Sequence, residues 1–224
     1  MLRTDLFTMV IRAIVLLTTI PVHEAAHAWV ADRLGDPTAR YRGRLTLNPM
    51  AHFDLMGSLA MILTGIGWAK PVPVNPLNFE NSKKGMAITA AAGPASNILL
   101  ATASLCISKI LMFIGFATNF NSVVMTFYTI FYTMTAINIS LAIFNLLPFP
   151  PFDGSRIFNY FLSDKYYFKI MEYEQQIFIG LFLLLCLGVF DAPLNFLSSI
   201  VLALLNKLTF FVDIIINFVL NIIL

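Results

Sequence analysis

His23-Glu24-Ala25-Ala26-His27 interrupts an apolar run that extends from residue 13 to residue 31. If this run is helical, the side chains of His23 and His27 lie on one face, roughly 5–6 Å apart, and can bind the same metal ion. Glu24 lies about 100° further round the helix, so it cannot chelate that metal with them, but it can reach a water molecule bound to it. The stretch predicts a site in which two imidazoles bind zinc and a carboxylate is the general base.

The setting of this motif matters, because five-residue matches of this kind also arise by chance in soluble proteins. Ionisable side chains are costly in lipid, and those that occur there usually face a cavity or a partner. Three of them within one turn of an apolar helix have no structural explanation. The setting therefore favours a functional interpretation of the motif.

The composition is that of a membrane protein. The chain is 58% hydrophobic and 12% charged, whereas soluble domains are about 45–50% apolar and 25% charged. We expect residues 1–224 to form a single integral membrane domain. The net charge of +2 says little about partners, and we expect no nucleic acid among them. Cys106 and Cys186 lie in apolar segments and are expected to be small core residues, not a disulfide or a metal site.

The apolar segments predict an all-α membrane protein with a bundle of about six membrane segments. Long helices are expected at about residues 5–34, 85–117, 123–147, 177–190 and 194–224. The last of these is either one overlong kinked helix or a span followed by an interfacial piece. Residues 55–68 are apolar but short for a span, and both their flanks are basic, so a re-entrant segment is expected there.

The polar segment after the first helix is rich in arginine. Its arginines at positions 33, 40, 42 and 44 predict the cytoplasmic side, which would place the histidine pair toward that side. Residues 41–47 alternate well enough for a short β-hairpin, although a plain surface loop fits about as well. His52 could be a metal ligand, but a histidine that anchors a loop by hydrogen bonds is the favoured interpretation.

A third candidate ligand follows the helix predicted at 123–147. Three prolines unwind the chain after Asn145, and Asp153 comes directly after the last of these turns. Two histidines and one carboxylate are a known ligand set for catalytic zinc. An Asp-Gly pair on its own would be a simple turn. Asn97, within the helix predicted at 85–117, is also notable because an amide in lipid needs a partner.

Three motifs together resemble the site-2 protease family of intramembrane zinc metalloproteases. They are His23-Glu-Ala-Ala-His27, Gly93-Pro-Ala-Ser-Asn97 and Asn145-Leu-Leu-Pro-Phe-Pro-Pro-Phe-Asp153-Gly154. The order of the motifs and their placement in apolar segments both match, over about residues 10–160. Phe152 stands where the family usually has leucine, a mild departure because both residues are apolar.

The resemblance implies one Zn²⁺ per chain on His23, His27 and Asp153, with Glu24 as the catalytic general base. It implies that Asn145 and Asn97 support the substrate or the oxyanion. It further implies a catalytic core at about residues 5–160, followed by C-terminal helices at about 171–224. The chain is similar to compact prokaryotic members that have neither a PDZ nor a CBS domain.

The implied activity is hydrolysis of peptide bonds in or near the transmembrane helices of substrate proteins, in regulated intramembrane proteolysis. The partners would be membrane-spanning protein substrates and the lipid bilayer. The implied location is the plasma (inner) membrane, with several spans and the active site toward the cytoplasm.

Two other functions compete with proteolysis. A metal-ion transporter could use the same cluster as an ion site, but it is expected to have duplicated halves or paired broken helices, and neither is clear here. A catalytically inactive membrane scaffold is the other alternative. A Glu24→Gln variant separates the protease from the scaffold, because it should abolish proteolysis and leave a scaffold intact.

Overall fold

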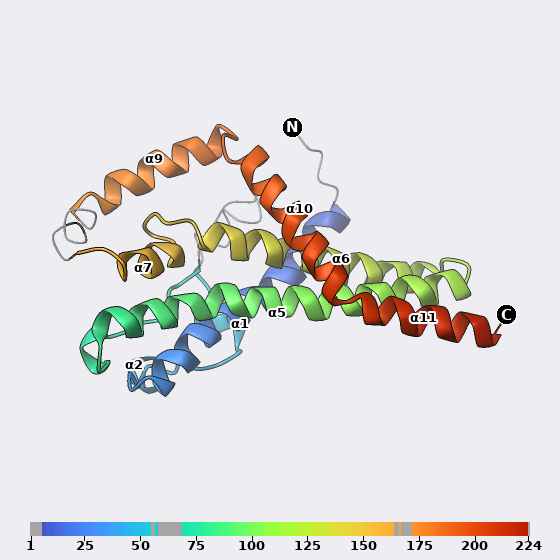
Figure 1. The fold of residues 1–224 in the computed structure, drawn as a ribbon, viewed down its shortest axis with the longest axis horizontal. Helices are drawn as coiled ribbons and strands as arrows, with labels where there is room; N and C mark the ends of the chain where they lie inside the picture. The colour runs from blue at the N-terminus through green and yellow to red at the C-terminus, as the bar shows by residue number, and fades with distance from the viewer. Residues whose placement is uncertain (1–5, 55–56, 58–68, 164–165, 167–171, 224) are drawn as a thin grey trace.

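The computed structural model describes residues 6–54, 57, 69–163, 166 and 172–223, and all regular structure within them is helical. This confirms the predicted all-α class. The long helices are α1 (Leu6–Arg33), α5 (Ser82–Ala117), α6 (Ser122–Asn145), α10 (Asp191–Leu208) and α11 (Phe210–Ile223). The shorter ones are α2 (Thr38–Tyr41), α3 (Pro49–His52), η1 (Pro76–Asn78), α7 (Asp153–Asn159) and α9 (Glu174–Cys186) (Figure 1).

Three of these helices are long and apolar enough to cross a membrane, namely α1, α5 and α6. The pair α10 and α11 passes the same test together, with a bend of 50° at the break between them. The described residues therefore give three spans, or four if the bent pair is one, and they do not support the predicted six. The re-entrant segment predicted at 55–68 falls outside the described residues apart from Gly57.

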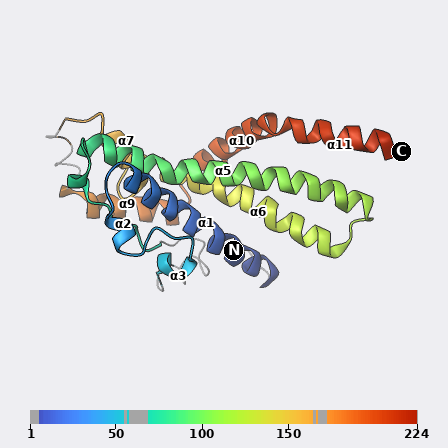
Figure 2. The same ribbon diagram turned by 90° about the horizontal axis from the view of Figure 1, so that it is seen from below.

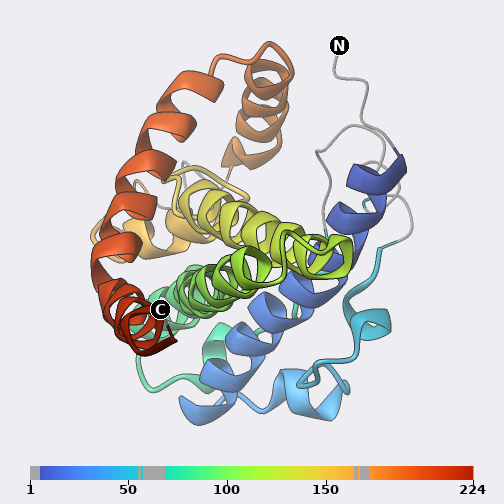
Figure 3. The same ribbon diagram turned by 90° about the vertical axis from the view of Figure 1, so that its right-hand side faces the viewer.

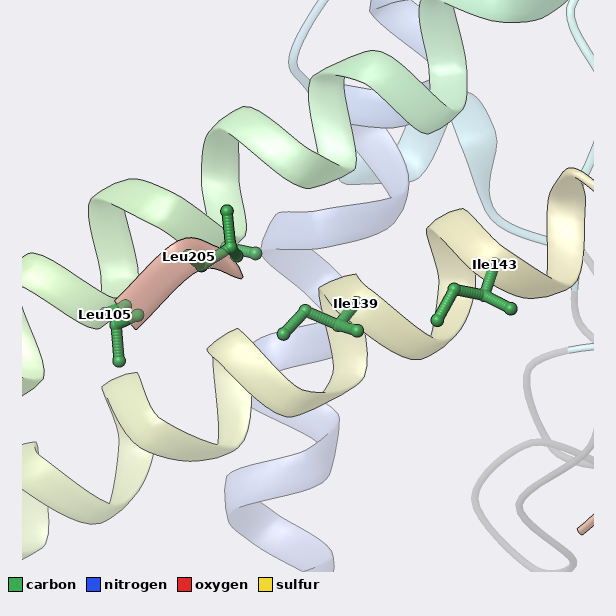
Figure 4. Close-up of a cluster of buried hydrophobic side chains, with 5 residues drawn as sticks. Leu105, Ile139, Ile143 and Leu205 are labelled. Atoms are coloured by element: carbon green, nitrogen blue, oxygen red, sulfur yellow. The ribbon is translucent and has the colours of Figure 1, made fainter. Parts of the chain in front are cut away.

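The antiparallel hairpin of α5 and α6 is the centre of the molecule, and α1 packs against both of its helices. Viewed from the end, α1 lies on one side of this hairpin and the α10–α11 pair on the other (Figure 3). A buried apolar cluster joins α5, α6 and α10 (Figure 4). Its members are Ala101, Leu105, Ile139, Ile143 and Leu205.

Residues 194–224 were predicted as one kinked helix or as a span followed by an interfacial piece, and the two helices bent by 50° at a break fit either prediction. The break falls at Thr209, whose hydroxyl donates a hydrogen bond back to the carbonyl of Leu205, 2.8 Å away. Beyond it, α11 runs beside α5 (Figure 2). An ion pair of 2.6 Å between Lys109 of α5 and Asp213 of α11 joins the two helices.

The β-hairpin predicted at residues 41–47 is wrong, because the described residues contain no strand and the segment begins as the end of α2. Gly43, at a φ of +65°, donates its N–H to the carbonyl of Arg40. The N–H of Arg44 donates to the carbonyl of Ala39. These two bonds form a Schellman motif, in which a glycine in the left-handed region closes a helix. The backbone donors therefore cap α2 and are not free for a ladder.

An irregular segment, residues 70–75, lies beside the second half of α1, and we call it the strap. Three of its residues, Lys70, Val72 and Asn75, precede prolines, which disfavour helical backbone at the preceding position. The side chain of Val72 is buried in a cluster with Ala28 of α1. At the far end of the strap, the N–H of Asn75 donates to the carboxylate of Asp36, 2.7 Å away.

Candidate metal centre

Three potential metal ligands from two helices meet at one point. The Nε2 atoms of His23 and His27 on α1 are 3.0 Å apart. The Oδ2 atom of Asp153, the first residue of α7, lies 3.3 Å from the Nε2 of His23 and 3.2 Å from the Nε2 of His27. The structure thus brings the distant Asp153 next to the histidine pair, and the role of these three residues as metal ligands stays a prediction.

A hydrogen bond at the second ring nitrogen of His27 fixes the tautomer and the orientation of this imidazole. Its Nδ1 is 2.7 Å from the backbone carbonyl of Thr89 on α5, and both groups are buried. Because a carbonyl can only accept, Nδ1 must carry the hydrogen, and in a neutral ring Nε2 then carries a lone pair. This lone pair points toward His23 and Asp153. A ligand histidine commonly has such a carbonyl behind it.

The backbone of α5 comes close to both imidazoles at Gly93. A β-carbon on this glycine would lie 2.4 Å from Nε2 of His27 and 2.5 Å from Cε1 of His23. No side chain fits in that space, so glycine allows α5 to close one side of the cluster. A Gly-Pro pair within a helix can be a simple packing kink, but Gly93 lies directly beside the two imidazoles.

A second glycine sets the position of Asp153. A β-carbon on Gly154 would lie 2.3 Å from the carbonyl oxygen of Leu146. The start of α7 can therefore lie directly against the backbone that follows α6. The ring of Phe152 packs on that of Phe144 with their centroids 4.4 Å apart, which braces the same turn. Here Phe152 does the apolar packing expected of the leucine usual in the family.

The donor set fits a zinc ion. In a tetrahedral site with bonds of about 2.0–2.1 Å, two ligand atoms are separated by about 3.3 Å, close to the three distances found. The Oδ2 of Asp153 is buried and has no hydrogen-bond donor among the described residues. Burial raises the pKa of Asp153, but its contacts with the imidazoles of His23 and His27 outweigh burial and hold that pKa below its usual range. A carboxylate with a lowered pKa suits a metal ligand, which must be deprotonated.

Glu24 follows His23 on α1 and is half-buried. Its Oε2 accepts a hydrogen bond of 3.0 Å from the backbone N–H of Val72 in the strap. Its carboxylate is not part of the group of three ligand atoms, as expected because Glu24 lies about 100° further round the helix than His23.

The two asparagines singled out from the sequence do not join the cluster through any hydrogen bond in the described part of the chain. Asn97 lies one turn along α5 from Gly93, is fully buried, and neither atom of its amide has a partner among the described residues. Asn145 is the last residue of α6 and is half-buried. Their roles stay predictions.

His52 is a loop anchor, as the favoured interpretation held. It is buried, and its Nε2 donates to the carbonyl of Thr46 at 2.9 Å. Its Nδ1 lies 3.4 Å from a guanidinium nitrogen of Arg44. It is not part of the group of three ligands found in the described residues.

Sequence reasoning missed the groups that act through the backbone. The carbonyl of Thr89 and the N–H of Val72 leave no trace in residue type, since any residue other than proline has both. One signal was available for the second group. Val72 stands between Pro71 and Pro73, so it carries the sole backbone donor of those three residues.

Comparison with known proteins gives the chain a family. Residues 11–187 match the sequence model of peptidase family M50. The candidate zinc metalloprotease YwhC of Bacillus subtilis is 36% identical over 172 residues, which cover 74% of this chain and 75% of YwhC. No solved structure gave a significant match.

Two further relatives are more distant and match over smaller shares of their own length. The candidate zinc metalloprotease Rip2 of Mycolicibacterium smegmatis is 30% identical over 62% of this chain and 52% of Rip2. The zinc metalloprotease MJ0392 of Methanocaldococcus jannaschii is 26% identical over 68% of this chain and 34% of MJ0392. With the family match over most of its length and apolar helices able to cross a membrane, the chain belongs to peptidase family M50, the site-2 protease family of membrane metalloproteases.

Proposed function

We propose that this protein is an intramembrane zinc endopeptidase that hydrolyses peptide bonds in or near the transmembrane helices of substrate proteins, as in regulated intramembrane proteolysis. The observation that carries the proposal is the convergence of His23, His27 and Asp153, with 3.0–3.3 Å between their ligand atoms. Family membership and relatives named as zinc metalloproteases support zinc as the ion, one per chain.

The chemistry divides between the metal and the chain. Zinc, when bound, acidifies water and polarises a carbonyl. Glu24 takes a proton from the water that attacks the scissile carbonyl carbon. When the carbon–nitrogen bond breaks, Glu24 passes this proton to the leaving amine. The carbonyl of Thr89 holds His27 in the tautomer that leaves Nε2 free for the metal.

The two asparagines have supporting roles in this proposal. Asn145 donates to the oxyanion that develops on the scissile carbonyl, since an amide N–H stabilises such charge in a site that excludes water. Asn97 supports the site from inside the bundle, where its amide is fully buried one turn from Gly93.

The substrate must present an extended backbone, because a helix hides its carbonyls in hydrogen bonds. We therefore propose that the substrate is a membrane-spanning helix that unwinds locally at the cleavage site. We place the protein in the plasma (inner) membrane with its site toward the cytoplasm, the side predicted by the arginines between α1 and α3. Residues 1–224 would act as one domain, with the catalytic core at about 5–160 and the C-terminal helices at about 171–224.

The rival functions have less support. A metal-ion transporter is expected to have paired broken helices, whereas the described residues show one bent pair, α10 and α11. An inactive scaffold has no need for a buried carboxylate beside two imidazoles, which is costly without a cation.

Metal content tests the site without knowledge of the substrate. We expect about one zinc per purified wild-type chain, and loss of this zinc in both His23→Ala and Asp153→Ala. Asp191→Ala, which removes an exposed aspartate at the start of α10, is the matched control and should keep its zinc. Absence of zinc from a folded wild-type chain, or full retention in Asp153→Ala, would refute the site.

Cleavage of a reporter tests the activity. The reporter is a single transmembrane segment interrupted by a Gly-Pro pair, labelled with a fluorophore at each end and reconstituted in vesicles with the protease. Wild type should cut it, Glu24→Gln should retain zinc but lose cleavage, and a reporter with leucines in place of the Gly-Pro pair should resist. If Glu24→Gln cuts at the wild-type rate, Glu24 is not the base and the proposed mechanism is wrong.

A further inference from the structure

The strap carries one backbone donor at the point where it meets Glu24. Proline has no N–H, so of the three residues Pro71, Val72 and Pro73 only Val72 can donate. That N–H lies 3.0 Å from Oε2 of Glu24. Residues 71–73 thus present a single backbone hydrogen-bond donor to the carboxylate.

The strap is held on both sides of this contact. The backbone carbonyl of Lys70 accepts from the guanidinium of Arg44 at 2.6 Å, and the N–H of Lys70 donates to the carbonyl of His52 at 3.0 Å. Three residues beyond Val72, the N–H of Asn75 donates to the buried carboxylate of Asp36. These bonds fix the strap to α3 and to the loop between α1 and α3.

The side chain of Val72 adds a third attachment. It is only 8% exposed and packs in a cluster with Ala28 of α1 and Ala39 of α2. Since Ala28 is one turn along α1 from Glu24, the strap is anchored to the same helix that carries the carboxylate. The position of the N–H relative to Glu24 is therefore set by the fold.

A glutamate needs such a restraint to act as a base at a fixed point. Its side chain has three rotatable bonds, and free rotation would leave the carboxylate in the productive orientation for only a fraction of the time. The bond from Val72 engages one carboxylate oxygen, Oε2, and among the described residues no hydrogen bond to Oε1 is found. A misplacement of about 1 Å in a catalytic group can cost about 100-fold in rate.

We propose that Val72 is a positioning residue, whose backbone N–H holds the Glu24 carboxylate in place beside the His23–His27–Asp153 cluster. The strap is then part of the catalytic apparatus although none of its side chains takes part in the reaction. This inference rests on the proposed function of Glu24 as general base, but the contact itself can be tested without substrate or metal.

Hydrogen–deuterium exchange of a peptide that covers residues 71–74 tests the contact. Only Val72 and Val74 have amide hydrogens in this peptide, so the loss of one hydrogen bond is directly visible. Glu24→Ala should increase the deuterium uptake of the peptide by about one at short times, whereas Glu24→Gln, which keeps a carbonyl acceptor, should change it less. Identical uptake in wild type and Glu24→Ala would overturn the proposal.

Kinetics with the reporter described above test the consequence. Val72→Pro removes the N–H and should lower kcat by about 10- to 100-fold with KM and zinc content unchanged. Val72→Ala keeps the N–H and removes most of the side chain, and Val74→Pro adds a proline to the same strap without removing that donor. Both variants keep the donor and disturb only the packing of the strap, so each should lose clearly less kcat than Val72→Pro.

A backbone ester at position 72, made with α-hydroxyisovaleric acid in place of Val72, repeats the test without a proline ring if Val72→Pro does not fold. It should give the same loss of kcat. Equal losses in Val72→Ala and in the ester would assign the effect to packing and overturn the role of the N–H. An increase in kcat for Val72→Pro would show that the strap obstructs the site, which is the opposite of the proposal.

The two proposals fail in different ways. If Glu24→Gln still cleaves the reporter, the base is misassigned and the proposed function fails. If Glu24→Gln is inactive while Val72→Pro and the ester cleave at the wild-type rate, Glu24 is the base but does not depend on Val72.

Discussion

Gly93 faces the rings of His23 and His27 at a distance that leaves no room for a β-carbon. The glycine lets α5 approach the histidines closely, and one turn earlier on α5 the carbonyl of Thr89 reaches Nδ1 of His27. Gly154 does the same on the other side, where it brings Asp153 up to the end of α6. The three ligands therefore depend on two positions at which a side chain is missing.

Gly93→Ala should disrupt the metal centre. The added methyl group would overlap Nε2 of His27, 2.4 Å from the new β-carbon, so either the imidazoles or α5 must move. We expect zinc affinity to fall by about 10- to 100-fold, the range found when groups that orient ligands are lost. The affinity is measured by competition with a coloured chelator.

Gly180→Ala on α9 is the control for this change, since a β-carbon there would meet nothing within 4 Å. It should leave zinc affinity unchanged and stabilise its helix slightly, because alanine is the better helix former. Equal zinc affinity in wild type and Gly93→Ala would mean that α5 does not press on the histidines.

The elements that frame the site are joined by the buried carboxylate of Asp36, just beyond the end of α1. It accepts hydrogen bonds from the hydroxyl and N–H of Thr38, from the side chain of Asn78 and from the N–H of Asn75 in the strap. Burial raises the pKa of Asp36, but these hydrogen bonds outweigh it and lower the pKa below the usual value. The fold thus uses one carboxylate to join α2, the strap and η1.

Stability should depend on pH through Asp36. A carboxylate whose pKa is lower in the folded state stabilises the fold above its unfolded pKa of about 4, and this contribution is lost as pH falls through the folded value. At pH 7, Asp36→Asn should therefore be less stable by about 1–3 kcal/mol, the worth of hydrogen bonds to a charged group. The difference in Tm from wild type should shrink as the pH is lowered from 5 toward 2.

Thermal unfolding in detergent at a series of pH values provides the measurement, and Asp191→Asn controls for the loss of one exposed negative charge. A gap between wild type and Asp36→Asn that persists unchanged at the lowest pH would show that the charge of Asp36 is not what stabilises the strap.

The sequence predicted the positions of the long helices well, and the turns and contacts between helices less well. The apolar runs located α1, α5 and α6 to within a few residues, because a membrane helix must be long and continuous. The hairpin at residues 41–47 was wrong because Gly43 serves a helix end, which apolar alternation does not reveal. Asp153 was found by its place after the prolines, but the hydrogen bonds of Thr89 and Val72 come from backbone groups that every segment has.

Across the whole molecule, charge is unevenly distributed between the two ends of the α5–α6 hairpin. The end near α2 carries the arginines at positions 40, 42 and 44, whereas the turn between α5 and α6, residues 118–121, has no charged side chain. From the positive-inside rule we predict that the first end faces the cytoplasm. The metal centre is nearer to that end, since Gly93 lies in the first half of α5.

Accessibility to a membrane-impermeant maleimide should reveal this orientation. In a chain whose two cysteines are replaced by alanine, Ser122→Cys at the exposed start of α6 should react in intact cells. Leu47→Cys, which is also an exposed position, should react only after the cells are made permeable. The reverse pattern would place the metal centre toward the outside.

Because α1 carries two of the ligands and α7 the third, the order in which the ribosome makes the chain has a consequence for the enzyme. His23, Glu24 and His27 enter the bilayer with the first helix, before the hairpin that will shield them has been synthesised. The ion cannot be held by all three ligands until α7 emerges, after α5 and α6. If these three residues are the ligands, as we propose, a nascent chain stays inert until most of it has been translated, and the protease gains activity only when its fold is nearly complete.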